Sequence, residues 1–364
     1  MKIFYLITGL GGGGAEKVVV ELAEQMFIRG HQVKIAYLKG VVVVQPKYKE
    51  IELIYLGFEN LKTIYAAYNN YKELITSFKP DVVHAHMVHA NIFARVTRKF
   101  QPIPKLICTA HSNNEGGKLR MLAYKFTHSL ADLTTNVSRA AARNFEILGA
   151  VPKGEIETVY NGIDLDRFKH QQQAECMLRA ELALTDTTPI FLAVGRLHEA
   201  KDYPNLIRAF ARLKENIKQS VVPKLVIAGD GDLKKSLEKM AIDFNITENV
   251  IFLGRRDDIP SLMAAADVFV LSSIFEGFGL VVAEAMACET FVIATDCGGV
   301  KEVMGEHGIL VQPNSAEKLA QAFIDFMQMD TQQINDNNKK ALNYIQHNFD
   351  LENIVNQWLE MYAA

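Results

Sequence analysis

Residues 268–287 read VFVLSSIFEGFGLVVAEAMA, an apolar segment, a glycine-containing turn and a second apolar segment of helical length. Val268–Leu271 is short, rich in β-branched residues and uninterrupted, which is typical of a strand buried on both faces of a parallel sheet. Gly277 and Gly279 break the pattern before Val281–Ala287 continues it as a predicted helix. A strand that turns directly into a helix is half of a βαβ unit, so this stretch predicts an α/β fold.

The same alternation of strands and helices extends in both directions. Residues 1–165 contain six predicted strands: Lys2–Ile7, Gln32–Tyr37, Glu52–Tyr55, Val82–His84, Lys105–Thr109 and Leu133–Asn136. A further six follow the polar segment Lys169–Glu175: Ile190–Gly195, Lys224–Ala228, Val250–Leu253, Val268–Leu271, Phe291–Ala294 and Ile309–Val311. The sequence therefore predicts two Rossmann-like, doubly wound parallel-sheet domains, residues 1–165 and 166–345, facing across a cleft. Residues 346–364 form a last segment with a predicted helix at Leu351–Tyr362.

Composition indicates an ordinary globular protein with an uneven charge distribution. Of 364 residues, 49% are hydrophobic and 22% are charged, and no apolar run approaches the roughly 18 residues of a membrane span. Residues 1–165 hold 20 Lys and Arg against 14 Asp and Glu, whereas the remainder holds 19 against 28. The basic half suits an anionic surface or acceptor, although an uneven surface charge without a partner is the alternative. We expect no nucleic-acid partner.

Leader and cysteine patterns bear on localisation. Ile3–Leu10 resembles a short signal-peptide core, but a glycine cluster and Glu16 follow at once, so we interpret it as a buried first strand. The four cysteines contain no C-x-x-C pair, which suits buried thiols in a reducing cytoplasm. The sequence thus favours a cytoplasmic protein.

A glycine loop follows the first predicted strand. Gly9, Gly11 and Gly14 satisfy G-x-G-x-x-G, and the helix that begins after Gly14 could receive a phosphate at its N-terminus. A nicotinamide-dependent oxidoreductase would also need an acidic residue at the end of the second strand, where this sequence has Lys39 and Gly40. The oxidoreductase and a structural turn without a ligand both remain alternatives at this point.

Two motifs in the second half carry candidate phosphate-binding and hydroxyl-binding residues. Gly195 permits a sharp turn, and Arg196 and Lys201 could hold a diphosphate without a metal. The alternative for Lys201 is a salt bridge to a neighbouring acid. Glu276 lies in the glycine turn, where its carboxylate can accept hydrogen bonds from sugar hydroxyls. Glu284 lies in the apolar helix that follows and, if buried, needs a polar partner such as a ribose diol.

These residues strongly resemble the retaining glycosyltransferases of family 4, which have the GT-B fold. The similarity spans nearly the whole chain, through the glycine loop with Ala15-Glu16-Lys17, Pro80–His86, Thr109-Ala110-His111, Asn161–Asp164, Val194–Leu197 with Lys201-Asp202, Ala228–Gly231, Phe252–Gly254, the E-x7-E segment Glu276–Glu284, and Gly298–Glu302. Each motif is weak alone, but their order and spacing are specific. One departure is Glu289-Thr290-Phe291, which stands where the family usually has a small residue and a proline, and which we interpret as a tolerated turn.

The resemblance implies a role for each candidate residue. Residues that would act in catalysis are Glu276, His111, Arg196 and Lys201; those that would bind the donor are Gly12, Gly13, Gly14, Gly195, Arg196, Lys201, Arg256, Glu276, Gly277, Phe278, Gly279, Leu280 and Glu284. By the same resemblance the first domain is the acceptor side, the second binds the nucleotide sugar, and the final helix crosses back to the first domain. Neither a cofactor nor an obligatory metal is expected, and we interpret His84, His86 and His89 as structural or acceptor-side residues.

The implied reaction is transfer of a hexose-type sugar, with retention, from a nucleotide diphosphate sugar (UDP by family frequency) to a glycan or lipid-linked glycan. Bacterial capsule, lipopolysaccharide or exopolysaccharide synthesis is the expected role, with peripheral contact at the inner face of the membrane. Three alternatives remain: an NAD(P)-dependent oxidoreductase, a transferase with a soluble small-molecule acceptor, and a catalytically silent binding protein.

Overall fold

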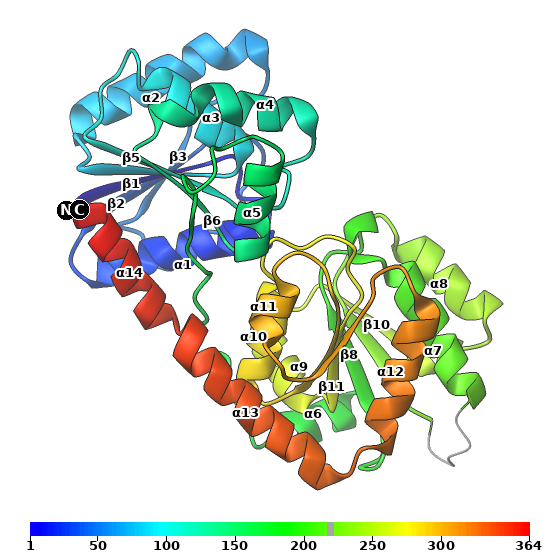
Figure 1. The fold of residues 1–364 in the computed structure, drawn as a ribbon. Helices are drawn as coiled ribbons and strands as arrows, with labels where there is room; N and C mark the ends of the chain where they lie inside the picture. Colours follow the sequence, from blue (N-terminus) through cyan, green and yellow to red (C-terminus); the bar gives the residue numbers. More distant parts are fainter. Residues whose placement is uncertain (217–221) are drawn as a thin grey trace. The chain divides into compact units, whose positions relative to one another are not determined.

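The computed structural model describes residues 1–216 and 222–364, which divide into two compact units (Figure 1). Unit 1 comprises Met1–Gly162 and Glu352–Ala364, and unit 2 comprises Ile163–Leu351. The first boundary lies close to residue 165 of the sequence analysis. The second differs, because residue 346 lies inside a helix that continues to Phe349.

Unit 1 is a seven-stranded parallel sheet with helices on both faces. Its elements are β1 (Lys2–Ile7), α1 (Gly14–Ile28), β2 (Gln32–Tyr37), β3 (Glu52–Tyr55), η1 (Leu61–Thr63), α2 (Ile64–Phe78), β4 (Val82–His86), α3 (Val88–Thr97), β5 (Lys105–Ala110), α4 (Lys118–Thr127), η2 (His128–Leu130), β6 (Leu133–Asn136), α5 (Arg139–Ile147), β7 (Glu157–Thr158) and α14 (Leu351–Ala363). The strand order is β3-β2-β1-β4-β5-β6-β7. In Figure 1, α2, α3 and α4 lie on one side of this sheet, and α1 and α14 lie on the other.

The two faces of this sheet are buried by different side chains of the same strands. Phe4 and Leu6 of β1 pack in a core cluster with Tyr71 of α2 and Phe93 of α3. Tyr5 points to the opposite face, where its hydroxyl lies 3.1 Å from that of Tyr362. This two-residue alternation explains why β1 is apolar throughout: both of its faces are covered.

The last helix, α14, is attached to unit 1 through a buried polar network. The Tyr362 hydroxyl lies 2.7 Å from His84 Nδ1, and the His84 Nε2 atom lies 2.7 Å from the Thr109 hydroxyl. Trp358 of the same helix packs against the His84 ring at a centroid distance of 4.5 Å. Residues more than 270 positions apart are therefore joined in one hydrogen-bonded core.

Unit 2 is a six-stranded parallel sheet in the order β10-β9-β8-β11-β12-β13. Its elements are α6 (Ala174–Glu181), β8 (Ile190–Val194), η3 (Glu199–Lys201), α7 (Tyr203–Asn216), β9 (Lys224–Ala228), α8 (Lys234–Asp243), η4 (Thr247–Asn249), β10 (Val250–Gly254), α9 (Ile259–Ala265), β11 (Val268–Leu271), α10 (Leu280–Ala287), β12 (Phe291–Thr295), α11 (Val300–Met304), β13 (Ile309–Val311), α12 (Ala316–Gln328) and α13 (Thr331–Phe349). Phe191 of β8 makes edge contacts with Phe210 of α7 and Phe323 of α12 at the centre of its core.

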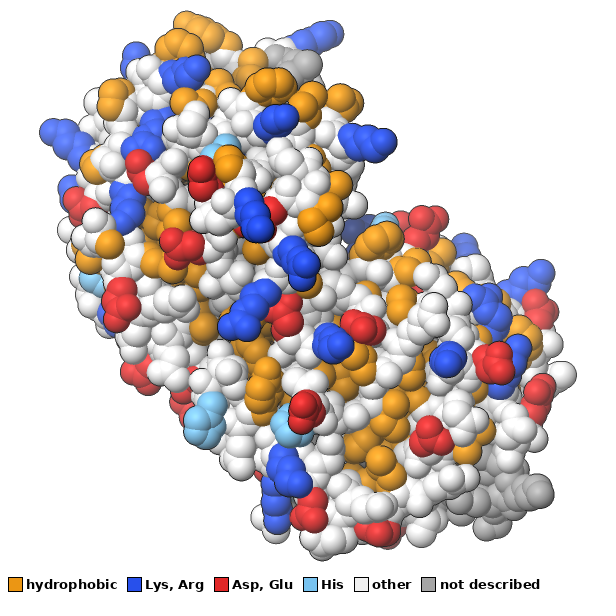
Figure 2. Space-filling view, viewed as in Figure 1, with side chains coloured by type: hydrophobic (Ala, Val, Ile, Leu, Met, Phe, Trp, Pro, Cys, Tyr) orange, Lys and Arg blue, Asp and Glu red, His pale blue; other side chains and the backbone are white. Residues whose placement is uncertain are grey.

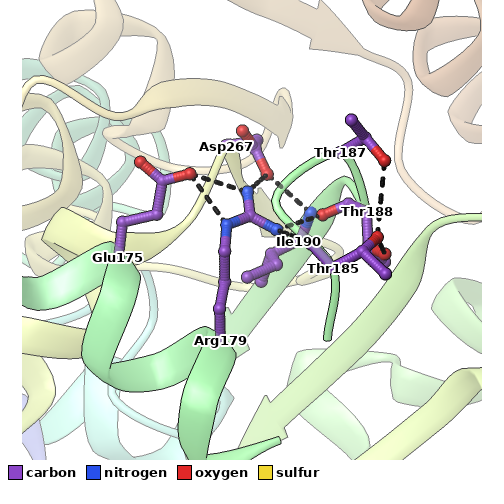
Figure 3. A network of polar contacts seen from close by, with 7 residues as sticks. All are labelled: Glu175, Arg179, Thr185, Thr187, Thr188, Ile190 and Asp267. Carbon is purple, nitrogen blue, oxygen red and sulfur yellow. Dashed lines mark hydrogen bonds and ion pairs between the residues drawn. The ribbon is translucent and has the colours of Figure 1, made fainter. Parts of the chain in front are cut away.

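A buried arginine fixes α6 to the start of two strands of unit 2 (Figure 3). The Arg179 guanidinium contacts Glu175 at 2.8 Å and Asp267 at 3.3 Å, and donates to the Thr188 carbonyl at 2.6 Å. Asp267 also accepts the Ile190 N–H at 2.7 Å, which ties the beginning of β8 to the residue before β11. Because a buried guanidinium needs acceptors for its donors, this network holds α6 in one position.

The predicted fold class is confirmed: both units are parallel α/β sheets, and all twelve expected strands are present. β7 was not predicted, and β4 continues two residues beyond the expected end at His84. The expectation of buried cysteines is wrong for Cys176, which is exposed on α6, whereas Cys108, Cys288 and Cys297 are buried.

Candidate active site

Two predicted site residues meet in unit 2 as an ion pair. Lys201, at the end of η3, lies 2.6 Å from Glu276 Oε1, and the Ser273 hydroxyl donates to the same oxygen at 2.7 Å. Their side chains are 23% and 14% exposed, so the pair is shielded from bulk water but remains reachable. The salt bridge considered as an alternative for Lys201 is therefore present, and its partner is the other candidate residue.

Backbone contacts hold the two loops of this pair together. The Ser272 hydroxyl donates to the Lys201 carbonyl at 2.7 Å, and the Ile274 N–H donates to the Ala200 carbonyl at 2.9 Å. Below Ser273, the Thr295 hydroxyl donates to the Ser273 carbonyl at 2.6 Å. The turn that carries Glu276 is thus fixed on both sides.

The Gly195 turn is shaped by close backbone packing. Gly195 has φ +153°, and the Tyr203 hydroxyl donates to its carbonyl at 3.1 Å. A Cβ atom on Gly229 would lie 1.9 Å from the Gly195 carbonyl oxygen, and one on Gly231 would lie 2.5 Å from the Leu197 carbonyl oxygen. Because no side chain fits there, these two glycines let the loops approach.

Helix α10 begins immediately after the glycine turn. Gly279 is its N-cap, with φ +97°, and a Cβ atom there would lie 3.0 Å from Val300 Cγ2. Phe278 is buried and packs edge-on against Phe349 at a centroid distance of 5.4 Å, so this residue could offer a ligand mainly its backbone. Glu284 is only 7% exposed, as the apolar pattern around it predicts.

The two candidate arginines have different surroundings. Arg196 is 71% exposed and lies 3.9 Å from Asp232, a loose pair that leaves its guanidinium in solvent. Arg256 contacts Glu181 at 2.5 Å and Asp258 at 2.6 Å. These carboxylates raise the pKa of Arg256 further above its usual range. The structure therefore places Arg256 in an ion-pair cluster with residues that the sequence analysis did not select.

The cysteine beside this site is not a nucleophile at neutral pH. Burial, followed by the charge of Glu276, raises the pKa of Cys297 to about 12, so its thiol stays protonated.

In unit 1, His111 lies directly after β5, at the carboxyl edge of the sheet. Its Nε2 atom is 3.0 Å from His86 Nδ1, and its backbone N–H donates to Glu115 Oε1 at 2.9 Å. Burial lowers the pKa of His111 to about 4, and burial also lowers that of His86. Both rings are therefore neutral near pH 7. A neutral imidazole has one unprotonated ring nitrogen, which can accept a proton.

The glycine loop precedes α1 as expected. Gly12 has φ +96° and lies against Val43, while Gly13 is the N-cap of α1 and Gly14 its first residue. A Cβ atom on Gly13 would lie 2.5 Å from the Glu16 carboxylate, so an acidic side chain lies close to this helix N-terminus.

Two family models match this chain. A model described as Glycosyltransferase Family 4 matches residues 12–167, and one described as Glycosyl transferases group 1 matches residues 177–343. The chain belongs to glycosyltransferase family 4. Enzymes of this family take a nucleotide sugar as substrate and generally need no cofactor. The assignment leaves the oxidoreductase hypothesis without support.

Characterised relatives span most of the chain. It is 28% identical, over 90% of its length and 91% of the relative's, to N-acetylgalactosamine-N,N'-diacetylbacillosaminyl-diphospho-undecaprenol 4-alpha-N-acetylgalactosaminyltransferase of Campylobacter jejuni. It is 27% identical, over 80% and 77%, to UDP-Gal:alpha-D-GlcNAc-diphosphoundecaprenol alpha-1,3-galactosyltransferase of Escherichia coli.

Solved structures show the same GT-B fold. Anabaena HepE in complex with UDP and glucose superposes with a TM-score of 0.86 at 23% identity and complete coverage of both chains. Sucrose-phosphate synthase from Thermosynechococcus elongatus gives 0.87 at 23% identity, covering 100% of this chain and 98% of the other.

Sequence reasoning missed several residues that shape the site. Ser273 and Glu115 hold Glu276 and His111 in place, and Gly229 and Gly231 were noted only as part of the family resemblance. The signal for Ser273 was its position three residues before Glu276 in a strand-to-helix turn. In residues 1–216 and 222–364, no group of three or more His, Cys, Asp or Glu could hold a metal, and no helix is long and apolar enough to cross a membrane.

Proposed function

We propose that this chain is a retaining hexosyltransferase that moves a sugar from a UDP-sugar to a lipid-diphosphate-linked glycan during bacterial surface-polysaccharide synthesis. The observation that carries the proposal is the Lys201–Glu276 pair, joined at 2.6 Å beside the Gly195 turn. The two relatives named for diphospho-undecaprenol acceptors support the acceptor class, and the HepE complex containing UDP supports the donor. A soluble small-molecule acceptor is the alternative.

In the proposed donor site, Lys201 exchanges its contact with Glu276 for a contact with the donor diphosphate. The donor diphosphate would contact Lys201 and Arg196, and Glu276 would then be available to accept hydrogen bonds from sugar hydroxyls. Ser273 would keep the carboxylate in place when Lys201 turns to the phosphate, because its hydrogen bond of 2.7 Å does not depend on the lysine. Glu284, buried on the next helix, is the proposed ribose-binding residue, and Arg256 is proposed to lie near the base.

The proposed catalysis is electrostatic. Arg196, Lys201 and the N-terminus of α10 would stabilise negative charge on the departing diphosphate. Front-face attack would retain the anomeric configuration, with the leaving phosphate oxygen taking the acceptor proton. His111 is a further proposed catalytic residue, and Gly12–Gly14 are further proposed donor-binding residues.

Thermal stability in the presence of nucleotides tests the donor assignment. UDP and a UDP-sugar at about 100 times their Kd should stabilise the protein by about 2.7 kcal/mol, and NAD should not. Replacing Lys201 with Ala should remove most of the UDP effect, whereas the matched variant Lys239→Ala, at an exposed position of α8, should keep it. If GDP alone stabilised the protein, UDP would be excluded as the donor nucleotide. If no nucleotide stabilised it, the proposal would be contradicted.

A further inference from the structure

An apolar cavity of about 670 Å³ lies between α2, α3 and α4 of unit 1. Its lining is almost entirely aliphatic and aromatic, from Phe58, Ile64, Tyr65, Tyr68, Val88, His89, Ile92, Phe93, Val96, Thr97, Phe100, Leu119, Arg120 and Ala123. We call this cavity the helical groove. The helices that line it, α2, α3 and α4, lie on the opposite face of the sheet from α14 (Figure 1).

The rim of the helical groove exposes large apolar side chains to solvent. Tyr65 is 73% exposed, Phe100 70% and Leu119 83%. In Figure 2, apolar side chains gather among basic ones over the part of unit 1 where these helices lie. Helix α4 also buries Met121 and Tyr124 on its inner side, so it is apolar on two sides. Contiguous exposed apolar surface of this kind marks a binding site.

The polar end of the helical groove is cationic. Val88 and His89 come from the first turn of α3, and Arg120 from the first turn of α4. Burial and the charges of Lys39 and Arg120 lower the pKa of His89, which indicates positive charge around it. Arg120 donates one hydrogen bond, of 2.8 Å, to the Glu115 carbonyl and has further N–H groups for an anion.

This polar end is joined to the candidate acceptor side. One oxygen of Glu115 accepts the Val88 N–H at 3.1 Å, and the other accepts the His111 N–H at 2.9 Å. A single buried carboxylate therefore connects a groove-lining residue to His111. A ligand anchored at Arg120 would have its apolar part in the helical groove and its other end toward the carboxyl edge of the sheet.

We propose that the helical groove binds the prenyl chain of a lipid-diphosphate acceptor, with the diphosphate at Arg120 and the sugar toward His111. The inference rests on the proposed function and names where its acceptor binds. A hydrocarbon chain fits better than a bilayer surface, because the apolar residues line an open groove of about 670 Å³ that a chain can fill. The guanidinium of Arg120 at one end complements a diphosphate, which a neutral lipid lacks.

Direct binding tests the proposal with the full chain. Isothermal titration calorimetry with geranylgeranyl diphosphate, below its aggregation concentration, should show binding, and inorganic diphosphate should bind at least about tenfold more weakly. Ala123→Trp fills the groove and should weaken geranylgeranyl diphosphate binding at least about tenfold. Val96→Asp, at a partly exposed lining position, should do the same by placing a charge in the chain's path.

The matched control is Ala66→Trp, which adds the same side chain on α2 about 160° around the helix from Tyr68. It should bind the prenyl diphosphate as the wild type does, and all three variants should retain UDP binding. Equal binding by wild type, A123W and V96D would overturn the proposal. Sedimentation with anionic phospholipid vesicles tests the alternative that this face contacts a bilayer. Binding to vesicles without any binding of prenyl diphosphate would support a bilayer contact and contradict the proposed prenyl-chain site.

Failure of the groove and failure of the proposed function are distinguishable. If A123W binds prenyl diphosphate normally and the wild type still transfers sugar, the groove assignment alone is wrong. If the wild type binds prenyl diphosphate in the groove but transfers no sugar to a prenyl-diphosphate-linked glycan, the function is wrong and the groove stands.

Discussion

Glu276 accepts two short hydrogen bonds from its own unit, from Lys201 at 2.6 Å and from Ser273 at 2.7 Å. These contacts restrict the carboxylate before any substrate arrives, and preorganisation of this kind lowers the cost of orienting a reacting group. The sequence selected Glu276 and Lys201 separately as candidate site residues. It could not predict that they contact each other, because that depends on how two loops 75 residues apart meet.

Replacing Glu276 with Gln should lower kcat/KM at least about 100-fold, because the charged acceptor for sugar hydroxyls is lost while the shape is kept. The assay is release of UDP from a UDP-sugar in the presence of acceptor. Glu238→Gln, at an exposed position of α8, is the control and should keep full activity. Near-wild-type turnover by E276Q would remove Glu276 from the mechanism.

The buried histidines of unit 1 should make its stability depend on pH. Burial lowers the pKa of His84, His86 and His111 in the folded state, the last to about 4. The unfolded chain then binds more protons below about pH 6.5, so stability is full above that pH and falls as the pH drops. Each histidine lowers the free energy of unfolding by up to about 1.4 kcal/mol for each pH unit below about pH 6.5.

Urea denaturation of the full chain at several pH values between about 7.5 and 5 checks this dependence, by giving the free energy of unfolding as a function of pH. His86→Gln should reduce the slope, and His170→Gln, at an exposed position, should leave it unchanged. Identical slopes for wild type and H86Q would contradict the account.

At the scale of elements, apolar runs bounded by turn residues predicted the strands because parallel strands are buried on both faces. β7 was missed because Glu157–Thr158 is two residues long and half exposed, which leaves no apolar pattern to detect. β4 was predicted to end at His84, two residues too short, because the next histidine, His86, reads as polar. Both are buried, and His84 is hydrogen-bonded to Thr109 and Tyr362.

Arg179 determines how firmly α6 is attached to unit 2. Replacing it with Met should cost about 1–3 kcal/mol, because Asp267, whose side chain is 37% exposed, loses its cationic partner. Chemical denaturation measures the loss. Adding Asp267→Asn should restore part of it, since an amide oxygen can still accept the Ile190 N–H. A double variant as unstable as the sum of the two single variants would show that the pair is not coupled.

Close packing of the Gly229 loop should make this position intolerant of side chains. Gly229→Ala would place Cβ 1.9 Å from the Gly195 carbonyl oxygen and should cost about 3 kcal/mol or more and weaken UDP binding. Gly254→Ala has a positive φ of 67° but nothing within 4 Å of its Cβ, so it should cost only about 1–2 kcal/mol. Equal losses, measured by thermal unfolding, would show that backbone strain alone explains Gly229.

At the scale of the whole molecule, the charge count of the first half included a basic residue that does not reach the surface. Arg95 was counted with the basic surface of the first half, yet it is fully buried, with a 2.6 Å hydrogen bond to Thr134 and its guanidinium over the Tyr124 ring. Arg98 is paired with Asp132 at 2.7 Å. Of the basic residues of α4, Arg120 lines the helical groove. Composition cannot separate structural from surface charges, because burial depends on tertiary packing.

A transfer assay tests the central claim most directly. Purified protein would be incubated with a panel of UDP- and GDP-sugars and a prenyl-diphosphate-linked glycan, and the product analysed by mass spectrometry and by NMR of the new anomeric proton. We expect one UDP-sugar to add a single sugar residue with the donor's anomeric configuration, and E276Q to add none. An inverted linkage would contradict the retaining mechanism, and no transfer from any donor, despite UDP binding, would contradict the proposed acceptor class.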